Sequence, residues 1–171
     1  KSSGLNHGLT GRYYGYYTAA NQTSFAGRVY SLDDFKAMMT SMTFREQHMT
    51  PLATALSFGD GKENAFPSAF AGNTGDRWAA AYTANLVVPE SGLYSFYSLA
   101  DDQLIVMIDD YKVLSVNGAG LASYGGCYLE KGIHTLYLGL LEITSGAYVT
   151  LYVKQPSESS YKLVPGDWLV P

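Results

Sequence analysis

The sequence has few charged side chains, no cluster of basic residues and no long apolar run. Charged residues make up 15% of its 171 residues, and the formal net charge is -4. Because proteins bind a phosphate backbone through clustered Lys and Arg side chains, this composition argues against nucleic acid as a partner. Every uncharged apolar stretch is shorter than the roughly 18 residues that a transmembrane helix needs, so no membrane insertion is expected.

Cysteine is almost absent as well. Cys127 stands alone, which excludes an internal disulfide, and it is interpreted as a small buried side chain and not as a nucleophile. The sequence lacks Gly-x-Ser-x-Gly, His-Glu-x-x-His and phosphate-loop motifs, and His7, His48 and His134 show no metal-ligand spacing. We therefore expect a binding module and not an enzyme.

Aromatic residues and glycine, in contrast, are abundant: 15 Tyr, 7 Phe and 2 Trp stand beside 18 Gly. Aromatic side chains suit the pleated surface of a sheet, and glycine suits the turns between strands. From Trp78 to Val88 large side chains alternate with small or polar ones, which is the period of a half-buried strand. Strands are expected at 9–17, 52–58, 78–88, 93–99, 104–108, 112–116, 133–141 and 147–153.

Short strands at this spacing predict an all-β fold, an antiparallel β-sandwich. The length suits a single domain over residues 1–171. The start at Lys1-Ser2-Ser3-Gly4 looks like a domain boundary, so the chain is interpreted as a module of a larger surface or secreted protein. The cluster of tyrosines at 13–17 either packs an edge of the sandwich or offers an exposed ring to a sugar face.

One segment carries a helix signal. Ser31 is a good N-cap residue, Asp34 stands three residues later, and Tyr30 and Phe35 are spaced as a hydrophobic staple. The apolar residues that follow recur at helical spacing and predict one short helix over residues 32–42, packed on the core through its Met and Phe side chains.

Two Asp-Asp pairs occur close together and have different interpretations. Asp109-Asp110 separates two apolar runs, which is typical of a hairpin turn, where Asp tolerates positive φ. Asp101-Asp102 follows a strand without Gly, Asn or Pro beside it. Neighbouring side chains of a regular strand point to opposite faces, so bringing both carboxylates to one point needs an unusual backbone, such as a cis non-proline peptide bond.

Two acidic neighbours without a cation nearby repel each other, and a bound Ca²⁺, which takes six to eight oxygen ligands, would relieve that repulsion. From the pair by itself a solvated loop is the favoured interpretation, and a calcium site is the alternative. Adjacent carboxylates cannot readily flank a scissile glycosidic bond from opposite sides, so a glycosidase pair is not expected.

Six segments form an ordered series of weak motifs. They are Gly-Leu-x-Gly-x-Tyr-Tyr at 8–14, Arg-Trp with Ala-Tyr at 77–82, Pro-x-x-Gly-x-Tyr-x-Phe at 89–96, Ala-Asp-Asp at 100–102, Leu-x-x-Gly-x-His at 129–134 and Thr-Ser-Gly-Ala at 144–147. In this order and spacing the sequence resembles PA14 domains over nearly its whole length. The opening segment and single helix are most similar to the PA14 domains of bacterial repeat-containing biofilm adhesins, and yeast flocculins carry the fold too.

The resemblance implies a lectin site in which a cis Asp-Asp pair holds Ca²⁺ and two adjacent sugar hydroxyls complete the metal shell. Carried onto this chain, it makes Asp101 and Asp102 the metal ligands of the first loop. A second loop would supply the side chain of Glu142 and a backbone carbonyl of Thr144 or Gly146. The Asn of the flocculin pattern is absent from this loop, which leaves its register open.

Gln103 stands where many PA14 domains carry Gly, and would either crowd the site or contact the sugar. The expected function is that of a calcium-dependent carbohydrate-binding module of an extracellular adhesin, monomeric by itself. The alternatives are a structural or protein-interaction module without glycan binding, and an accessory glycan-binding domain of a secreted glycoside hydrolase.

Overall fold

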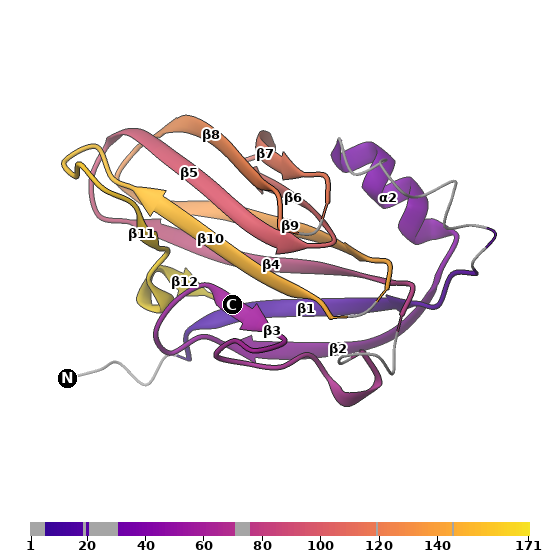
Figure 1. The fold of residues 1–171 in the computed structure, drawn as a ribbon. Helices are drawn as coiled ribbons and strands as arrows, with labels where there is room; N and C mark the ends of the chain where they lie inside the picture. The colour runs from indigo at the N-terminus through magenta and orange to yellow at the C-terminus, as the bar shows by residue number, and fades with distance from the viewer. Residues whose placement is uncertain (1–5, 19, 21–30, 71–75, 119, 145) are drawn as a thin grey trace.

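The computed structural model describes residues 6–18, 20, 31–70, 76–118, 120–144 and 146–171, and Figure 1 shows that they form two facing β-sheets with one helix outside. The predicted antiparallel β-sandwich is confirmed. The strands are β1 (Gly8–Gly15), β2 (Thr43–Pro51), β3 (Ser57–Gly59), β4 (Trp78–Val88), β5 (Gly92–Asp101), β6 (Gln103–Ile108), β7 (Tyr111–Val116), β8 (Ala122–Leu129), β9 (Gly132–Glu142), β10 (Tyr148–Lys154), β11 (Lys162–Leu163) and β12 (Leu169–Val170).

Strands that are distant in sequence pair at the centre of each sheet. The seven-stranded sheet has the order β2-β1-β4-β9-β6-β7, with β12 also paired to β4, and the five-stranded sheet has the order β11-β10-β5-β8, with β3 paired to β10. β4 and β9 are antiparallel over their full length, from Trp78 opposite Glu142 to Val88 opposite Gly132. This pairing places the end of β9 beside the start of β4.

The main core lies between the sheets and follows the alternation of the strands. On β9, Leu136, Leu138 and Leu140 point inward, and on β5 the inward residues include Tyr94 and Phe96. All five are at most 2% exposed. Such large buried aromatic and aliphatic side chains supply the apolar area that holds the sheets together.

A second apolar cluster lies on the outer face of the seven-stranded sheet, where α2 (Leu32–Thr40) packs. Ser31 caps the helix, since its hydroxyl accepts a hydrogen bond from the Asp34 N–H at 3.1 Å. The buried Phe35 ring lies against Gly139, where a Cβ atom would stand 2.7 Å from the ring. The helix was therefore placed correctly, although it ends at Thr40, and Tyr30 of the predicted staple lies outside the described residues.

Four strands were not predicted from the sequence: β2, β8 and the two-residue strands β11 and β12. β2 is an edge strand with mostly exposed side chains, so it lacks apolar alternation and is held by its pairing with β1. β8 contains Gly125-Gly126, which look like a turn; a Cβ on Gly125 would lie 1.8 Å from the Val113 carbonyl oxygen, so glycine permits this strand to approach β7 closely. The predicted strand at 52–58 is wrong for most of its length, because only the segment from Ser57 is in β3.

The Asp109-Asp110 hairpin is confirmed, with φ of 49° and 64° between β6 and β7. One Asp109 oxygen accepts from the Thr135 N–H at 2.9 Å and the other contacts His134, so this pair is part of the fold. Burial raises the pKa of the half-buried Cys127 to about 11, which agrees with a structural side chain. Within the described part of the chain, no helix is both long and apolar enough to cross a bilayer.

Candidate metal centre

The candidate site lies where the chain crosses from one sheet to the other. Asp101 is the last residue of β5 in the five-stranded sheet, and β6 of the seven-stranded sheet begins at Gln103, so Asp102 is the single residue between them. The peptide bond between Asp101 and Asp102 is cis. Glu142, the last residue of β9, arrives at the same end of the sandwich opposite Trp78.

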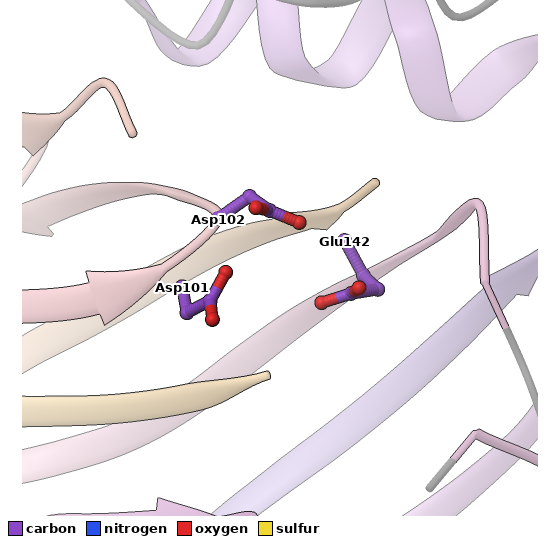
Figure 2. A group of neighbouring side chains, drawn as sticks. All are labelled: Asp101, Asp102 and Glu142. Carbon is purple, nitrogen blue, oxygen red and sulfur yellow. The ribbon is translucent and has the colours of Figure 1, made fainter. Parts of the chain in front are cut away.

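These three carboxylates form one cluster, as Figure 2 shows. Each contributes an oxygen atom, and the three oxygens lie within 4.8 Å of one another. The structure thus brings together Asp101, Asp102 and Glu142, residues of two loops that the sequence analysis assigned to one metal site.

Glu142 is the most unusual member of the cluster because its carboxylate is buried without a partner. It continues the inward row of Leu136, Leu138 and Leu140, so its side chain enters the rim of the space between the sheets. The residue is 0% exposed, and neither carboxylate oxygen has a hydrogen-bond partner. Burial, followed by the charges of Asp102 and Asp101, raises the pKa of Glu142 to about 10.

Asp101 is in a similar electrostatic position. Its pKa is raised to about 7 by partial burial, by its hydrogen bond with the Asp102 side chain, and by the charges of Asp102 and Asp60. The neighbouring charges that raise the pKa of Asp101 and Glu142 are all acidic. Without a cation, some of these carboxylates retain protons near neutral pH.

Hydrogen bonds position the second loop against the Asp-Asp pair. The N–H of Ile143 donates to Asp102 Oδ2 at 2.6 Å, and the hydroxyl of the buried Tyr17 donates to the Glu142 carbonyl oxygen at 2.7 Å. The first contact joins the crossover to the residues after β9. The second shows that Tyr17, from the tyrosine cluster at 13–17, supports the backbone of the site and does not face solvent.

The remaining predicted site residues have different surroundings. Thr144 is exposed and Gly146 is half-buried in the loop after β9, and their role as carbonyl ligands stays a prediction. Gln103 is only 4% exposed. Its amide nitrogen donates to the Asn117 carbonyl oxygen at 3.4 Å and its Oε1 atom is buried without a partner, so a sugar contact by Gln103 also stays a prediction.

Sequence reasoning missed Asp60, which lies at the same end of the sandwich. Asp60 Oδ2 accepts from the Ala147 N–H at 2.9 Å, and its own N–H donates to the Ala147 carbonyl oxygen at 2.8 Å. A Cβ on Gly146 would lie 2.9 Å from the same carboxylate oxygen, so any other residue there would press on the Asp60 side chain. The segment Gly59-Asp60-Gly61 looks like an ordinary turn, and nothing local in it predicts that β3 pairs with β10 and brings Asp60 to this loop.

No family profile matches the sequence, and no curated protein sequence is similar to it. Solved structures do match. A PA14 sugar-binding domain from an RTX adhesin superimposes with a TM-score of 0.68 at 15% identity, over 96% of this chain and 98% of that one. The A domain of epithelial adhesin 9 from Candida glabrata, in complex with Galβ1-3GlcNAc, gives a TM-score of 0.71 at 12% identity, over 97% and 89%.

An anti-sigma factor domain-containing protein is similar as well, with a TM-score of 0.66 at 18% identity. The match covers 97% of this chain but 48% of that protein, so the chain spans about half of its length. At these identities the comparisons establish the fold, and they confirm the one that the ordered motifs predicted.

Proposed function

Since the chain has the fold of PA14 domains, we propose that it is a calcium-dependent carbohydrate-binding module in which Asp101, Asp102 and Glu142 hold the ion. The observation that carries this proposal is the buried, unpartnered carboxylate of Glu142 within reach of two further carboxylates. A buried charge without a partner is costly, and a divalent cation is the partner that three converging carboxylates fit.

The donor set suits calcium better than a softer metal. All three side chains offer hard oxygen atoms, and no His or Cys joins them in the cluster among the described residues. Ca²⁺ accepts six to eight oxygens in flexible geometry, whereas zinc prefers His and Cys ligands. Three carboxylates leave several positions, which carbonyl groups of the loop holding Thr144 and Gly146 and an exogenous ligand would complete.

In this proposal Asp101, Asp102 and Glu142 would hold the ion. When bound, calcium would supply positive charge for two adjacent hydroxyls of a sugar. Asp102 holds the loop after β9 through Ile143, and Asp60 holds it through Ala147. Two of the similar structures are described as a sugar-binding domain and as an adhesin domain in complex with a galactoside, which supports carbohydrate as the ligand class.

The proposed carbohydrate binding also indicates a biological setting. We propose that the module acts without catalysis as a monomeric unit of an extracellular adhesin, where weak single contacts gain strength by avidity. A calcium ion that only rigidifies the loops is the second candidate, because the hydrogen bonds of Asp102 and Asp60 already join segments of both sheets. An accessory role beside a glycosidase domain keeps the same site and differs only in the parent protein.

A glycan array probed with the fluorescently labelled chain in millimolar calcium tests the proposal. We expect binding to a subset of glycans that is abolished by EDTA and restored by excess calcium. The Asp101→Asn variant should lose this signal, whereas Asp110→Asn, in the β6–β7 hairpin, should retain it. A calcium-stabilised protein that binds no glycan would favour the structural candidate.

A further inference from the structure

Four tyrosines gather on the outer side of the five-stranded sheet, away from the core. Tyr124 of β8, Tyr97 of β5 and Tyr152 of β10 lie opposite one another in the strand register, and Tyr161 comes from the segment between β10 and β11. We call these four residues the tyrosine ladder. β8, β5 and β10, which carry three of them, run side by side in Figure 1.

The rings of the ladder are in direct contact. Tyr97 and Tyr152 stack with centroids 4.2 Å apart and an interplanar angle of 4°, and Tyr124 follows at 5.3 Å and 31° from Tyr97. Tyr161 meets Tyr97 edge to face at 4.8 Å and Tyr124 at 6.4 Å. The rings are thus fixed against one another before any ligand arrives, which lowers the entropy lost on binding.

Sheet stability explains only part of this arrangement. Cross-strand aromatic pairs stabilise a sheet, and the Tyr97–Tyr152 pair fits that role. Tyr124, however, is 66% exposed at the end of the row, so most of its ring is open to solvent. A rigid, exposed aromatic surface with phenol hydroxyls is amphipathic, which suits a ligand that has both apolar and hydroxyl faces.

The ladder and the metal centre share strand β5, on which Tyr97 and Asp101 occupy positions of the same alternation. Asp101 and Tyr97 are four residues apart on β5, which corresponds to about 13 Å along a strand. Between them on the same side of the sheet lie the neutral Leu99 and, opposite it on β10, Thr150. Tyr148 pairs with Asp101 at the near end of this path.

The charged side chains near this path favour an uncharged ligand. The carboxylates of Asp60, Asp101, Asp102 and Glu142 lie at one end, and the chain carries a net charge of -4. At the ladder, the charged group in ring contact among the described residues is Lys154, whose ammonium lies 5.1 Å from the Tyr161 ring centroid. A polyanion would be repelled by the acidic end, whereas a neutral sugar chain meets no such penalty.

From this geometry we infer that the tyrosine ladder is a second glycan subsite, which binds internal residues of a neutral polysaccharide chain. The apolar C–H face of a sugar ring stacks on Tyr124, and the sugar hydroxyls bind the phenol groups of the ladder. The inference rests on the proposed function in one respect: the polysaccharide is taken to run from the metal centre to the ladder. It deepens that function by naming a polymer as the ligand. The contact with Tyr124 itself needs no metal.

Affinity gel electrophoresis in native gels tests the subsite. The gels contain neutral galactomannan, β-1,4-galactan or dextran, with the polyanion alginate as a control polymer, each with calcium or with EDTA. The variants are Tyr124→Ala and Tyr161→Ala, and the matched control is Tyr111→Ala, a tyrosine that is 57% exposed on β7 of the other sheet. Melting temperatures of all variants verify that they are folded.

We expect at least one neutral polysaccharide to retard the protein, with an affinity about three- to tenfold lower in Tyr124→Ala and unchanged in Tyr111→Ala. The loss should occur in EDTA as well, and binding of a free monosaccharide in calcium should be unaffected. Equal retardation of Tyr124→Ala and the parent protein, retardation by no neutral polymer, or a dimer in sedimentation that Tyr124→Ala abolishes would overturn the subsite. Tyr124-dependent retardation without any calcium-dependent sugar binding would retain it and refute the proposed metal-dependent function instead.

Discussion

Asp102 and Ile143, which are 41 residues apart, are joined by a hydrogen bond of 2.6 Å from the Ile143 N–H to Asp102 Oδ2. One residue lies in the crossover between the two sheets and the other follows β9. The contact fixes the distance between the Asp-Asp pair and the buried carboxylate of Glu142. It uses Asp102 Oδ2, and the Asp102 side chain also hydrogen-bonds Asp101.

Replacing Asp102 is expected to weaken calcium binding while the sandwich stays folded. Asp102→Ala removes a ligand and the acceptor for Ile143, and we expect calcium affinity to fall about 10- to 100-fold or more, as for lost ligand support at metal sites. Calcium titration calorimetry measures the change, with Asp110→Asn as the control that removes a carboxylate from the β6–β7 hairpin. Equal affinity in Asp102→Ala and the parent chain would exclude Asp102 as a ligand.

The stability of the metal-free protein should fall as pH rises from about 4 to 7. The pKa of Asp101 is raised to about 7 in the folded state, so the folded chain retains a proton that the unfolded chain releases near pH 4. Stability then decreases with pH across this window, and the raised pKa of Glu142 extends the decrease to higher pH.

Calcium should reverse this trend, because deprotonated carboxylates bind the ion more tightly. Thermal unfolding at pH 5, 6, 7 and 8, in EDTA and in calcium, checks both slopes. A metal-free melting temperature that rises from pH 5 to pH 8 would contradict the assignment of Asp101 and Glu142 as groups that retain protons.

Glu142→Gln separates the effect of the buried carboxyl group on stability from its effect on calcium binding. The amide has nearly the same shape but cannot ionise, so at pH 8 in EDTA we expect a free energy of unfolding equal to that of the parent or higher by on the order of 1 kcal/mol. In calcium the order should invert, because Glu142→Gln lacks a charged ligand. Denaturant unfolding in both buffers measures the crossing, and a variant that is less stable in EDTA would indicate a structural role instead.

Asp60 is expected to act through the loop that it holds. Asp60→Asn keeps an oxygen that can accept from the Ala147 N–H but removes the charge, whereas Asp60→Ala removes both. We expect Asp60→Ala to lose about 1 kcal/mol of stability, the usual contribution of such a hydrogen bond, and Asp60→Asn to lose less. The melting temperatures and calcium affinities of the two variants are compared with those of the parent, which tests whether the hydrogen bond to Ala147 or the charge of Asp60 supports the site. Values identical to the parent in both variants would show that Asp60 has no effect on the loop.

The sequence was most informative where side chains alternate with burial. The period from Trp78 to Val88 predicted β4, and the caps and spacing after Ser31 predicted α2 within two residues. β2 was missed because an edge strand exposed to solvent has no apolar pattern, and β8 was missed because its glycines serve a close approach to β7 that only the folded chain contains.

The candidate site, like the fold, was predicted in part. Asp101 and Asp102 were predicted as ligands from the adjacent carboxylates together with the resemblance of Ala-Asp-Asp to the PA14 motif, and Glu142 because that resemblance placed a second loop there; the structure brings the three carboxylates together. Asp60 was not found, since its role depends on the pairing of β3 with β10. The tyrosine ladder has the same origin: its four members are spread over more than 60 residues, and only the register of β8, β5 and β10 aligns them.

The most direct test of the account is the calcium dependence of thermal unfolding for the parent chain and for Asp101→Asn at pH 7.5. Calcium at about 100 times its dissociation constant should stabilise the parent by about 2.7 kcal/mol. For a chain of this size that corresponds to a rise in melting temperature of about 5 to 10 °C. Asp101→Asn should show no rise at the same concentration. A parent chain whose melting temperature is the same in EDTA and in millimolar calcium would contradict the metal centre.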